Sequence, residues 1–258
     1  MNKKILKESI LYNTMKRKVG KKKVQEKEEE SVVAKPISAT KMRRDLYWVI
    51  GAMIVLLVLF FVASYFFRNL DKFDYKGLAF TKIKYGEIPM YHYYYYFTDP
   101  TGQLIRYNLF LRNDPRKNNV SVSGDIQFVK NQTAYISVNI TDLLKCQYGT
   151  VGIATLTSFL VNNQIDVKGG VPDEKIAKEN NLTYVTCDNR PYHTVINLQS
   201  GDKTEITREG LSCHTITISG CDNIMKAIEK FELEAILDAK GRQAEENKNT
   251  GSGVFSLK

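Results

Sequence analysis

The chain has 258 residues, with 37 lysine and arginine and 28 aspartate and glutamate side chains, which gives a formal net charge of +9. The positive charge is uneven: residues 1–45 hold 14 basic and 6 acidic side chains, whereas residues 69–258 hold 22 of each. A C-terminal part without net charge excludes a uniformly basic nucleic-acid-binding domain.

Residues 1–45 predict a disordered cytoplasmic tail, because they combine basic clusters with an acidic run and offer too few apolar side chains for a core. A short amphipathic helix is compatible with the apolar residues Ile5, Leu6, Ile10 and Leu11. Anionic lipid headgroups are therefore the expected partner of this tail. Nucleic acid is not expected, because aromatic residues are not interleaved with the basic ones.

Residues 46–67 contain no charge and predict one transmembrane helix that anchors the chain in a lipid bilayer. At 1.5 Å per residue, such a helix covers the roughly 30 Å hydrocarbon core. A buried helix of a soluble protein is a weaker explanation, because an all-round apolar helix of this length needs a large protein around it. A cleaved signal peptide is disfavoured as well, since its apolar region spans only about 7–15 residues.

The distribution of charges, cysteines and glycosylation motifs predicts the orientation of the chain. Basic residues close to a span stay in the cytoplasm, so the N-terminus is expected inside the cell membrane and the C-terminal part outside it. All cysteines follow the span, as do the glycosylation candidates Asn119, Asn131, Asn139 and Asn181. Both features fit an oxidising exterior. Alternating apolar residues place Asn119 and Asn139 on the solvent side of two strands.

The outer part begins with strands. Residues 68–86 are interpreted as a short juxtamembrane connector. Residues 91–97 and 105–111 flank a glycine-containing turn and predict a β-hairpin. Further strands are expected at 119–129 and 133–140, so the first half of the outer part is predicted to be an antiparallel sheet.

The second half mixes helices and strands. Helices are predicted at 150–161, where the glycines suit helix packing, at 173–180 and at 222–241, with strands between them at 182–187, 194–199, 205–208 and 213–219. The fold class expected for residues 87–241 is therefore an extracytoplasmic α+β domain, an antiparallel sheet with two or three helices. Residues 242–258 are expected to form a flexible polar tail.

Two short segments resemble known sequences. The segments LRNDPR (residues 111–116) and CDNIMKAIEKF (residues 221–231) are similar to parts of single-pass membrane proteins of archaea. The resemblance implies a prokaryotic cell-surface protein, and it implies no activity, cofactor or functional residue.

The cysteines are interpreted as two structural disulfides, because no pair has the Cys-x-x-Cys spacing of redox and zinc motifs. Sequence leaves all three pairings of the disulfide candidates Cys146, Cys187, Cys213 and Cys221 open. One alternative is a reactive Cys221 thiolate at a helix N-terminus. Another is a zinc site built from Cys187, His193, Cys213, His214 or Cys221, but the spacings match no tight ligand pattern. No metal and no cofactor are therefore predicted.

The aromatic run at residues 91–97 is the candidate binding site. Alternate side chains of a strand face opposite sides, so one set enters the core and the other faces outward. Outward-facing Tyr94 and Tyr96, with His92, would offer a rigid hydrogen-bonding surface for a protein or glycan partner. The alternative is that tyrosine simply favours strands.

Two hypotheses of function follow. The preferred one is a non-enzymatic, membrane-anchored binding or assembly module of the cell envelope, because hydrolase, phosphate-loop and metalloprotease motifs are missing from the sequence. The alternative is an extracytoplasmic enzyme, thiol-redox or metal-dependent, that uses Cys213, Cys221 or His214.

Overall fold

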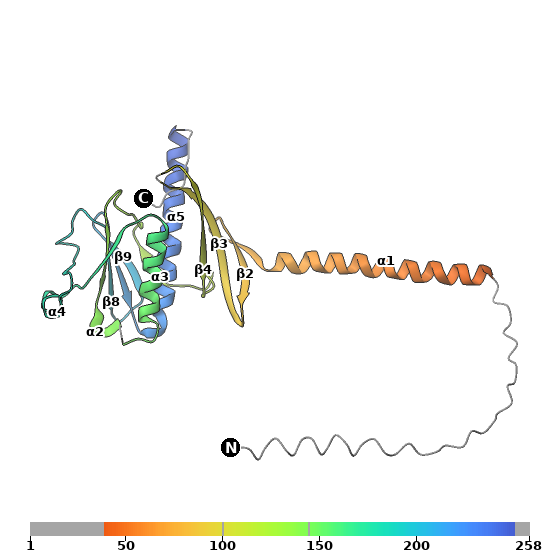
Figure 1. Cartoon of the computed structure of the whole chain (residues 1–258), viewed down its shortest axis with the longest axis horizontal. Coiled ribbons are helices and arrows are strands. Elements are labelled where there is room, and N and C mark those ends of the chain that lie inside the picture. The colour runs from red at the N-terminus through yellow and green to blue at the C-terminus, as the bar shows by residue number, and fades with distance from the viewer. Residues whose placement is uncertain (1–38, 100, 144, 251–258) are drawn as a thin grey trace, which may run out of the picture. The chain divides into compact units, whose positions relative to one another are not determined.

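The computed structural model describes residues 39–99, 101–143 and 145–250 (Figure 1). The predictions for residues 1–38 and for the last residues, 251–258, lie outside the described residues. The chain divides into two compact units, Met1–Leu59 and Phe60–Lys258.

Helix α1 (Ala39–Leu70) contains the predicted span. Its segment Arg43–Phe67 has a mean hydropathy of 2.8, and none of its apolar window is buried. Among the described helices it alone is long and apolar enough to cross a membrane. The helix is longer than the 22-residue apolar stretch because the flanking residues carry no helix breaker after Pro36.

The first sheet is a four-stranded antiparallel meander, which confirms the predicted sheet and hairpin. It also includes residues that were interpreted as a connector, because Leu78 and Phe80 alternate with exposed neighbours and are fully buried. A Lys76–Gly77 turn in left-handed backbone conformation joins the first two strands. The strands are β1 (Lys72–Tyr75), β2 (Leu78–Tyr85), β3 (Ile88–Thr98) and β4 (Leu104–Leu111).

The second sheet is mixed and has six strands in the order β5-β9-β10-β8-β6-β7. Every neighbouring pair in it is parallel except β9–β10. The strands are β5 (Ser121–Ser123), β6 (Ala134–Val138), β7 (Val167–Gly170), β8 (Val195–Ser200), β9 (Glu205–Glu209) and β10 (Cys213–Ile218).

This second sheet corrects two expectations. The segments at 119–129 and 133–140 do not extend the antiparallel sheet, because β5 and β6 pair with β9 and with β7 and β8 instead. The strand expected at 182–187 is reduced to an isolated bridge between Val171 and Tyr184. The strand with which a segment pairs depends on contacts with distant parts of the sequence, and the alternation of apolar residues within the segment does not predict it.

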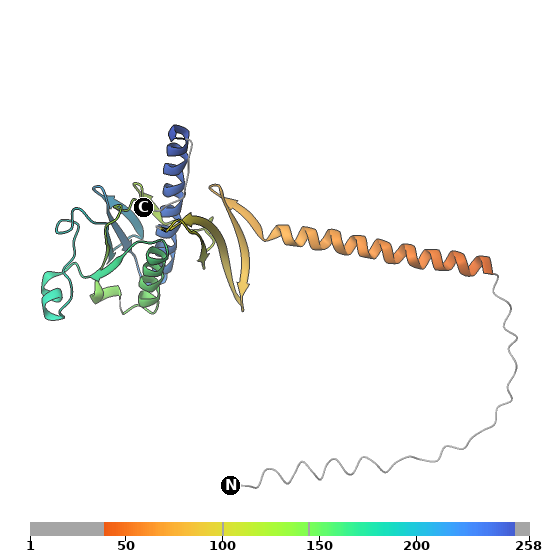
Figure 2. The ribbon, with the colours of Figure 1, turned by 45° about the horizontal axis from the view of Figure 1, so that its top comes forward.

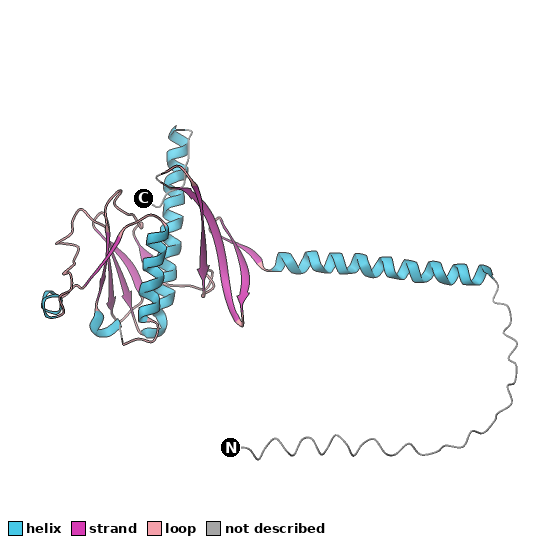
Figure 3. Ribbon diagram, in the orientation of Figure 1, coloured by secondary structure: helices cyan, strands magenta, loops and turns pink. Residues whose placement is uncertain are grey.

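Two helices lie between the two sheets. In Figures 1 and 2, α5 (Ile224–Thr250) runs between the four-stranded sheet and the sheet that contains β8 and β9, with α3 (Gly149–Asn162) beside it. Figure 3 shows the same sheet–helix–sheet layering. The remaining helices are short: α2 (Ile140–Leu143), α4 (Glu174–Glu179) and a 3-10 turn at Cys221–Asn223. The molecule is thus α+β, as predicted.

Helix α5 is buried on every side over much of its length. The five residues predicted to form its apolar face are all buried: Ile224, Ile228, Phe231, Ala235 and Ala239. The opposite side carries Glu229, Lys230, Glu232 and Glu234, and these are buried too, because this side of the helix packs against the first sheet. The helix also continues past Gly241 to Thr250, where a flexible tail was expected.

Buried charges on α5 have defined partners in the first sheet. Both oxygens of Glu229 accept hydrogen bonds from the backbone N–H groups of Arg112 and Asn113, at 2.7 and 3.0 Å. Glu234 lies between Lys76 and Lys230, with N–O distances of 3.0 and 2.8 Å. Burial opposes its ionisation, but these lysines outweigh that effect and lower the pKa of Glu234. The charges therefore tie the helix to the sheet.

Gly152 allows α3 to approach α5 closely. A Cβ atom at this position would lie 2.7 Å from Ile224 Cγ2 and 2.7 Å from Ile228 Cδ1. This contact confirms the interpretation that glycine in this helix serves packing.

We expect Gly152→Ala to lower the free energy of unfolding by about 1–3 kcal/mol, because overpacking forces both isoleucines to move. Gly241→Ala is the matched control, since a Cβ atom there meets nothing within 4 Å in α5. Alanine at that helical position should be neutral or stabilising, by up to about 1 kcal/mol. Urea unfolding curves of both variants measure the difference, and equal effects would contradict the packing role.

Candidate functional site

The outer surface of the first sheet is the candidate binding site. Strand β3 alternates as the sequence pattern predicts: Tyr91, Tyr93, Tyr95 and Phe97 are buried against the core. His92, Tyr94 and Tyr96 project from the opposite side, and both tyrosines expose 47% of their surface. Of the two arrangements that the sequence left open, the structure therefore has the odd-numbered set inside.

Strand β4 completes this surface. The register pairs His92 with Phe110, Tyr94 with Asn108, and Tyr96 with Arg106. We define the aromatic face as the outward-facing residues of β3 and β4: Met90, His92, Tyr94, Tyr96, Leu104, Arg106, Asn108 and Phe110. The β4 members of this face were not among the predicted site residues. Their alternation was visible, but their position opposite the tyrosines depends on the register of the hairpin.

Contacts within the aromatic face hold its side chains in place. His92 stacks on Phe110 with ring centroids 4.7 Å apart and an interplanar angle of 20°. The Arg106 guanidinium lies 4.1 Å from the centre of the Tyr94 ring. The His92 Nε2 atom is 3.1 Å from the Asn108 side-chain oxygen. These contacts fix the side chains relative to one another, so the surface is ordered before any partner binds.

The four cysteines form two disulfides, Cys146–Cys221 and Cys187–Cys213. This confirms the prediction of disulfide bonding and selects one of the three pairings. Cys213 and Cys221 are therefore not free thiols in this structure, as the enzyme hypothesis would require of a nucleophile.

The Cys187–Cys213 disulfide lines a cavity of about 340 Å³. The residues around it include Arg190, His193 and Glu209. Glu209 pairs directly with Cys213 across β9 and β10, so the two side chains lie on the same side of the sheet. The ligand atoms of Cys187, Glu209 and Cys213 all lie within 4.8 Å of one another.

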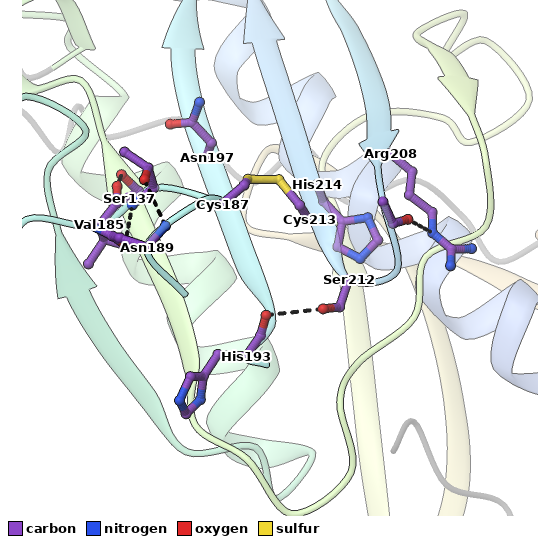
Figure 4. The surroundings of a disulfide bond; sticks show 12 residues. Ser137, Val185, Cys187, Asn189, His193, Asn197, Arg208, Ser212, Cys213 and His214 are labelled. Atoms are coloured by element: carbon purple, nitrogen blue, oxygen red, sulfur yellow. Dashed lines mark hydrogen bonds between the residues drawn. A yellow bond between two sulfur atoms is a disulfide. The ribbon is translucent and has the colours of Figure 1, made fainter. Parts of the chain in front are cut away.

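His214 does not belong to this cluster. It projects from the other side of β10 from Cys213, as neighbouring strand residues must (Figure 4). Its Nε2–H group donates to the Gln127 carbonyl at 2.9 Å. Burial lowers the pKa of His214 to about 4, so the ring is neutral at physiological pH. Packing between Phe128 and Phe231 makes it a core residue.

The other candidate ligands stay apart as well. His193 donates through Nδ1 to the Thr133 carbonyl, at 3.2 Å, and stacks edge-on against Tyr135. Cys221 lies in the second disulfide, with Cys146. Within the described residues, the five side chains considered for zinc therefore do not converge.

The glycosylation candidates differ in position. Asn119, Asn131 and Asn181 are exposed. Asn139 was expected on the solvent side of a strand, but it follows β6 and is half-buried, with its side-chain oxygen accepting from the Thr141 hydroxyl and backbone N–H. The strand face on which it was expected does not exist, because all five residues of β6 are buried and this central strand has no solvent side.

Comparison with protein families, with curated proteins and with solved structures finds no match for this chain. The arguments for its function therefore come from its own residues.

Proposed function

We propose that this protein is a membrane-anchored, non-enzymatic binding module of the cell envelope, and that its aromatic face binds a protein partner outside the cell. Residues 46–67 cross the membrane in this proposal, with the N-terminus in the cytoplasm. The observation that carries the proposal is the ordered, half-exposed aromatic surface on β3 and β4.

The composition of the aromatic face favours a protein over a glycan. It contains methionine, tyrosine, phenylalanine and arginine, and no lysine, aspartate or glutamate. Protein interfaces are enriched in the first set and depleted in the second. Sugars stack on open ring faces, but Arg106 covers Tyr94, and His92 and Phe110 cover each other. Binding of a protein would also cost little side-chain entropy, because the side chains of the aromatic face are already fixed.

A cross-linking experiment tests this assignment in the native membrane. A photo-reactive phenylalanine analogue placed at Phe110 in the full-length chain should form a discrete adduct that protease removes and glycosidase does not. An adduct sensitive only to glycosidase would show a glycan partner and contradict the proposal. The same analogue at Tyr192, which is 82% exposed in a distant loop, serves as the background control.

We expect the double substitution Tyr94→Ala and Tyr96→Ala to abolish that adduct. Truncation of an interface hot-spot residue costs at least about 2 kcal/mol, which is roughly 30-fold in affinity. Tyr192→Ala is the matched control and should leave the adduct unchanged. An adduct that survives the loss of both tyrosines would exclude them from the binding surface.

The proposed topology gives a separate expectation. Protease added outside intact cells should digest an epitope fused after Lys258 and leave an epitope fused before Met1 intact, because the basic tail is retained inside. Immunoblots against each epitope show which of the two the protease has digested. Protection of the C-terminal tag would reverse the orientation.

A further inference from the structure

We propose that the Cys187–Cys213 disulfide is a redox-controlled metal site, which binds one zinc ion through Cys187, Cys213 and Glu209 after reduction. This goes beyond the proposed binding function and does not depend on it. The inference starts from the cluster of three ligand atoms within 4.8 Å of one another, on the wall of the 340 Å³ cavity.

The ligand set suits zinc. Two thiolates and one carboxylate are ordinary zinc ligands, and three protein ligands leave a fourth tetrahedral position for water or another small ligand. The cavity provides room for that ligand. Beside a bound cation, the exposed Glu209 carboxylate supplies the third bond. Strand register keeps it there, since Glu209 is paired with Cys213.

The charge of the site is balanced by its surroundings. Two thiolates, one carboxylate and Zn²⁺ add up to a net charge of −1. Arg190 lines the same cavity and supplies one positive charge. Its Nε–H group is buried and has no hydrogen-bond partner within the part of the chain that the structure describes. The Arg190 guanidinium lies 5.1 Å from the centre of the Tyr135 ring, and its Nε–H group is free to donate to an anionic group in the cavity.

The loop that carries Cys187 is held in place without the disulfide (Figure 4). The Thr186 N–H donates to the Asn189 side-chain oxygen at 2.9 Å, and the Asn189 amide donates to the Tyr184 carbonyl at 3.2 Å. Before the loop, Val185 is fully buried and its carbonyl accepts from the Ser137 hydroxyl at 2.7 Å. Cys187 therefore stays close to Cys213 when the sulfur–sulfur bond opens, and little ordering is needed for metal binding.

The chemistry is a two-electron exchange followed by ligation. A dithiol reductant donates two electrons and two protons, so the protein disulfide becomes two thiols and the reductant becomes a disulfide. Zn²⁺ then displaces the two thiol protons and bonds to both sulfurs and to the Glu209 carboxylate. In the reverse step, a disulfide oxidant accepts two electrons from the two thiolates and becomes a dithiol; the protein disulfide forms again and Zn²⁺ leaves, because a disulfide sulfur is a poor ligand.

Metal titration of the full-length chain in detergent micelles tests the proposal. The protein is reduced anaerobically with a phosphine, desalted and titrated with Zn²⁺ and, as a spectroscopic probe, Co²⁺. We expect one metal per reduced chain, with a thiolate-to-cobalt charge-transfer band in the near ultraviolet, and no such band in the oxidised protein. Circular dichroism shows whether the reduced chain remains folded. A folded reduced chain without the band, or a chain that stays unfolded with zinc present, would overturn the proposal.

Two variants separate this site from the other cysteine pair. Glu209→Gln keeps all four cysteines and should weaken zinc binding at least about tenfold while the thiolate band remains. Replacement of Cys187 and Cys213 with alanine should abolish the band, whereas replacement of Cys146 and Cys221 should preserve it. Unchanged affinity in Glu209→Gln, or a band that follows Cys146 and Cys221, would refute the assignment.

Discussion

Replacement of Cys146 and Cys221 with alanine is expected to lower the free energy of unfolding by about 4 kcal/mol, because this bridge closes a loop with a sequence separation of 75 residues. Closing so long a loop removes much of the conformational entropy of the unfolded chain. Urea unfolding of the variant and of the oxidised parent measures the difference. A loss below about 1 kcal/mol would show that the unfolded state is already restricted in other ways.

The second disulfide provides the comparison for this prediction. Cys187 and Cys213 are separated by 26 residues, so their removal should cost somewhat less, about 3.5 kcal/mol. Since stability of a domain is only about 5–15 kcal/mol, loss of both bridges in the absence of zinc should lower the stability of the disulfide-bonded domain sharply. The rate of digestion by a protease, compared before and after full reduction, measures this loss of stability.

Glu232→Gln should make the protein progressively more stable than the parent as the pH rises. The Glu232 side chain is fully buried within α5, and its Oε1 atom has no hydrogen-bond partner among the residues that the structure describes. Burial, assisted by the nearby charge of Glu229, raises the pKa of Glu232 well above its usual value. The folded protein therefore keeps this carboxyl protonated.

The sign of the pH effect follows from proton binding. Between the unfolded pKa of about 4.3 and the raised folded pKa, the folded state holds a proton that the unfolded state has released. Stability of the parent therefore falls as the pH rises through this window, by about 1.4 kcal/mol per pH unit for one group. Glutamine has the shape of the neutral acid and does not titrate, so the variant lacks this loss.

Unfolding curves of both proteins from pH 4 to pH 8 measure the predicted divergence. Glu229→Gln is the contrasting variant, because both Glu229 oxygens accept N–H groups and an amide nitrogen would face a donor. It should destabilise the protein throughout the range. Parallel pH curves for Glu232→Gln and the parent would mean that the Glu232 carboxyl has an ordinary pKa in the folded state.

Local patterns predicted the elements of this protein better than their arrangement. The apolar run, the hairpin around residues 91–111 and the apolar positions of the last helix were all identified from spacing. The same patterns could not show that the first sheet covers the charged side of α5, because that depends on how segments far apart in the sequence pack together. The short strands β1 and β2 were missed for a related reason: four to eight residues give a weak periodic signal.

The candidate sites were predictable to a similar extent. Alternation along residues 91–97 identified His92, Tyr94 and Tyr96 as one set, but not whether that set faced outward. Their partners Arg106 and Phe110 required the register of β4. Likewise, the cysteines indicated two bridges, while Glu209 became a neighbour of Cys213 only through the pairing of β9 with β10. A site whose residues come from several strands cannot be predicted from the spacing of residues within one segment.

The two bridges are nested, since residues 187 and 213 both lie inside the loop that Cys146 and Cys221 close. A single proteolytic cut anywhere between residues 147 and 220 therefore leaves both fragments joined as one covalent molecule. In the proposed topology, release of the distal fragment therefore needs a reductant in addition to a protease, whereas a cut between residues 112 and 133 would release it directly.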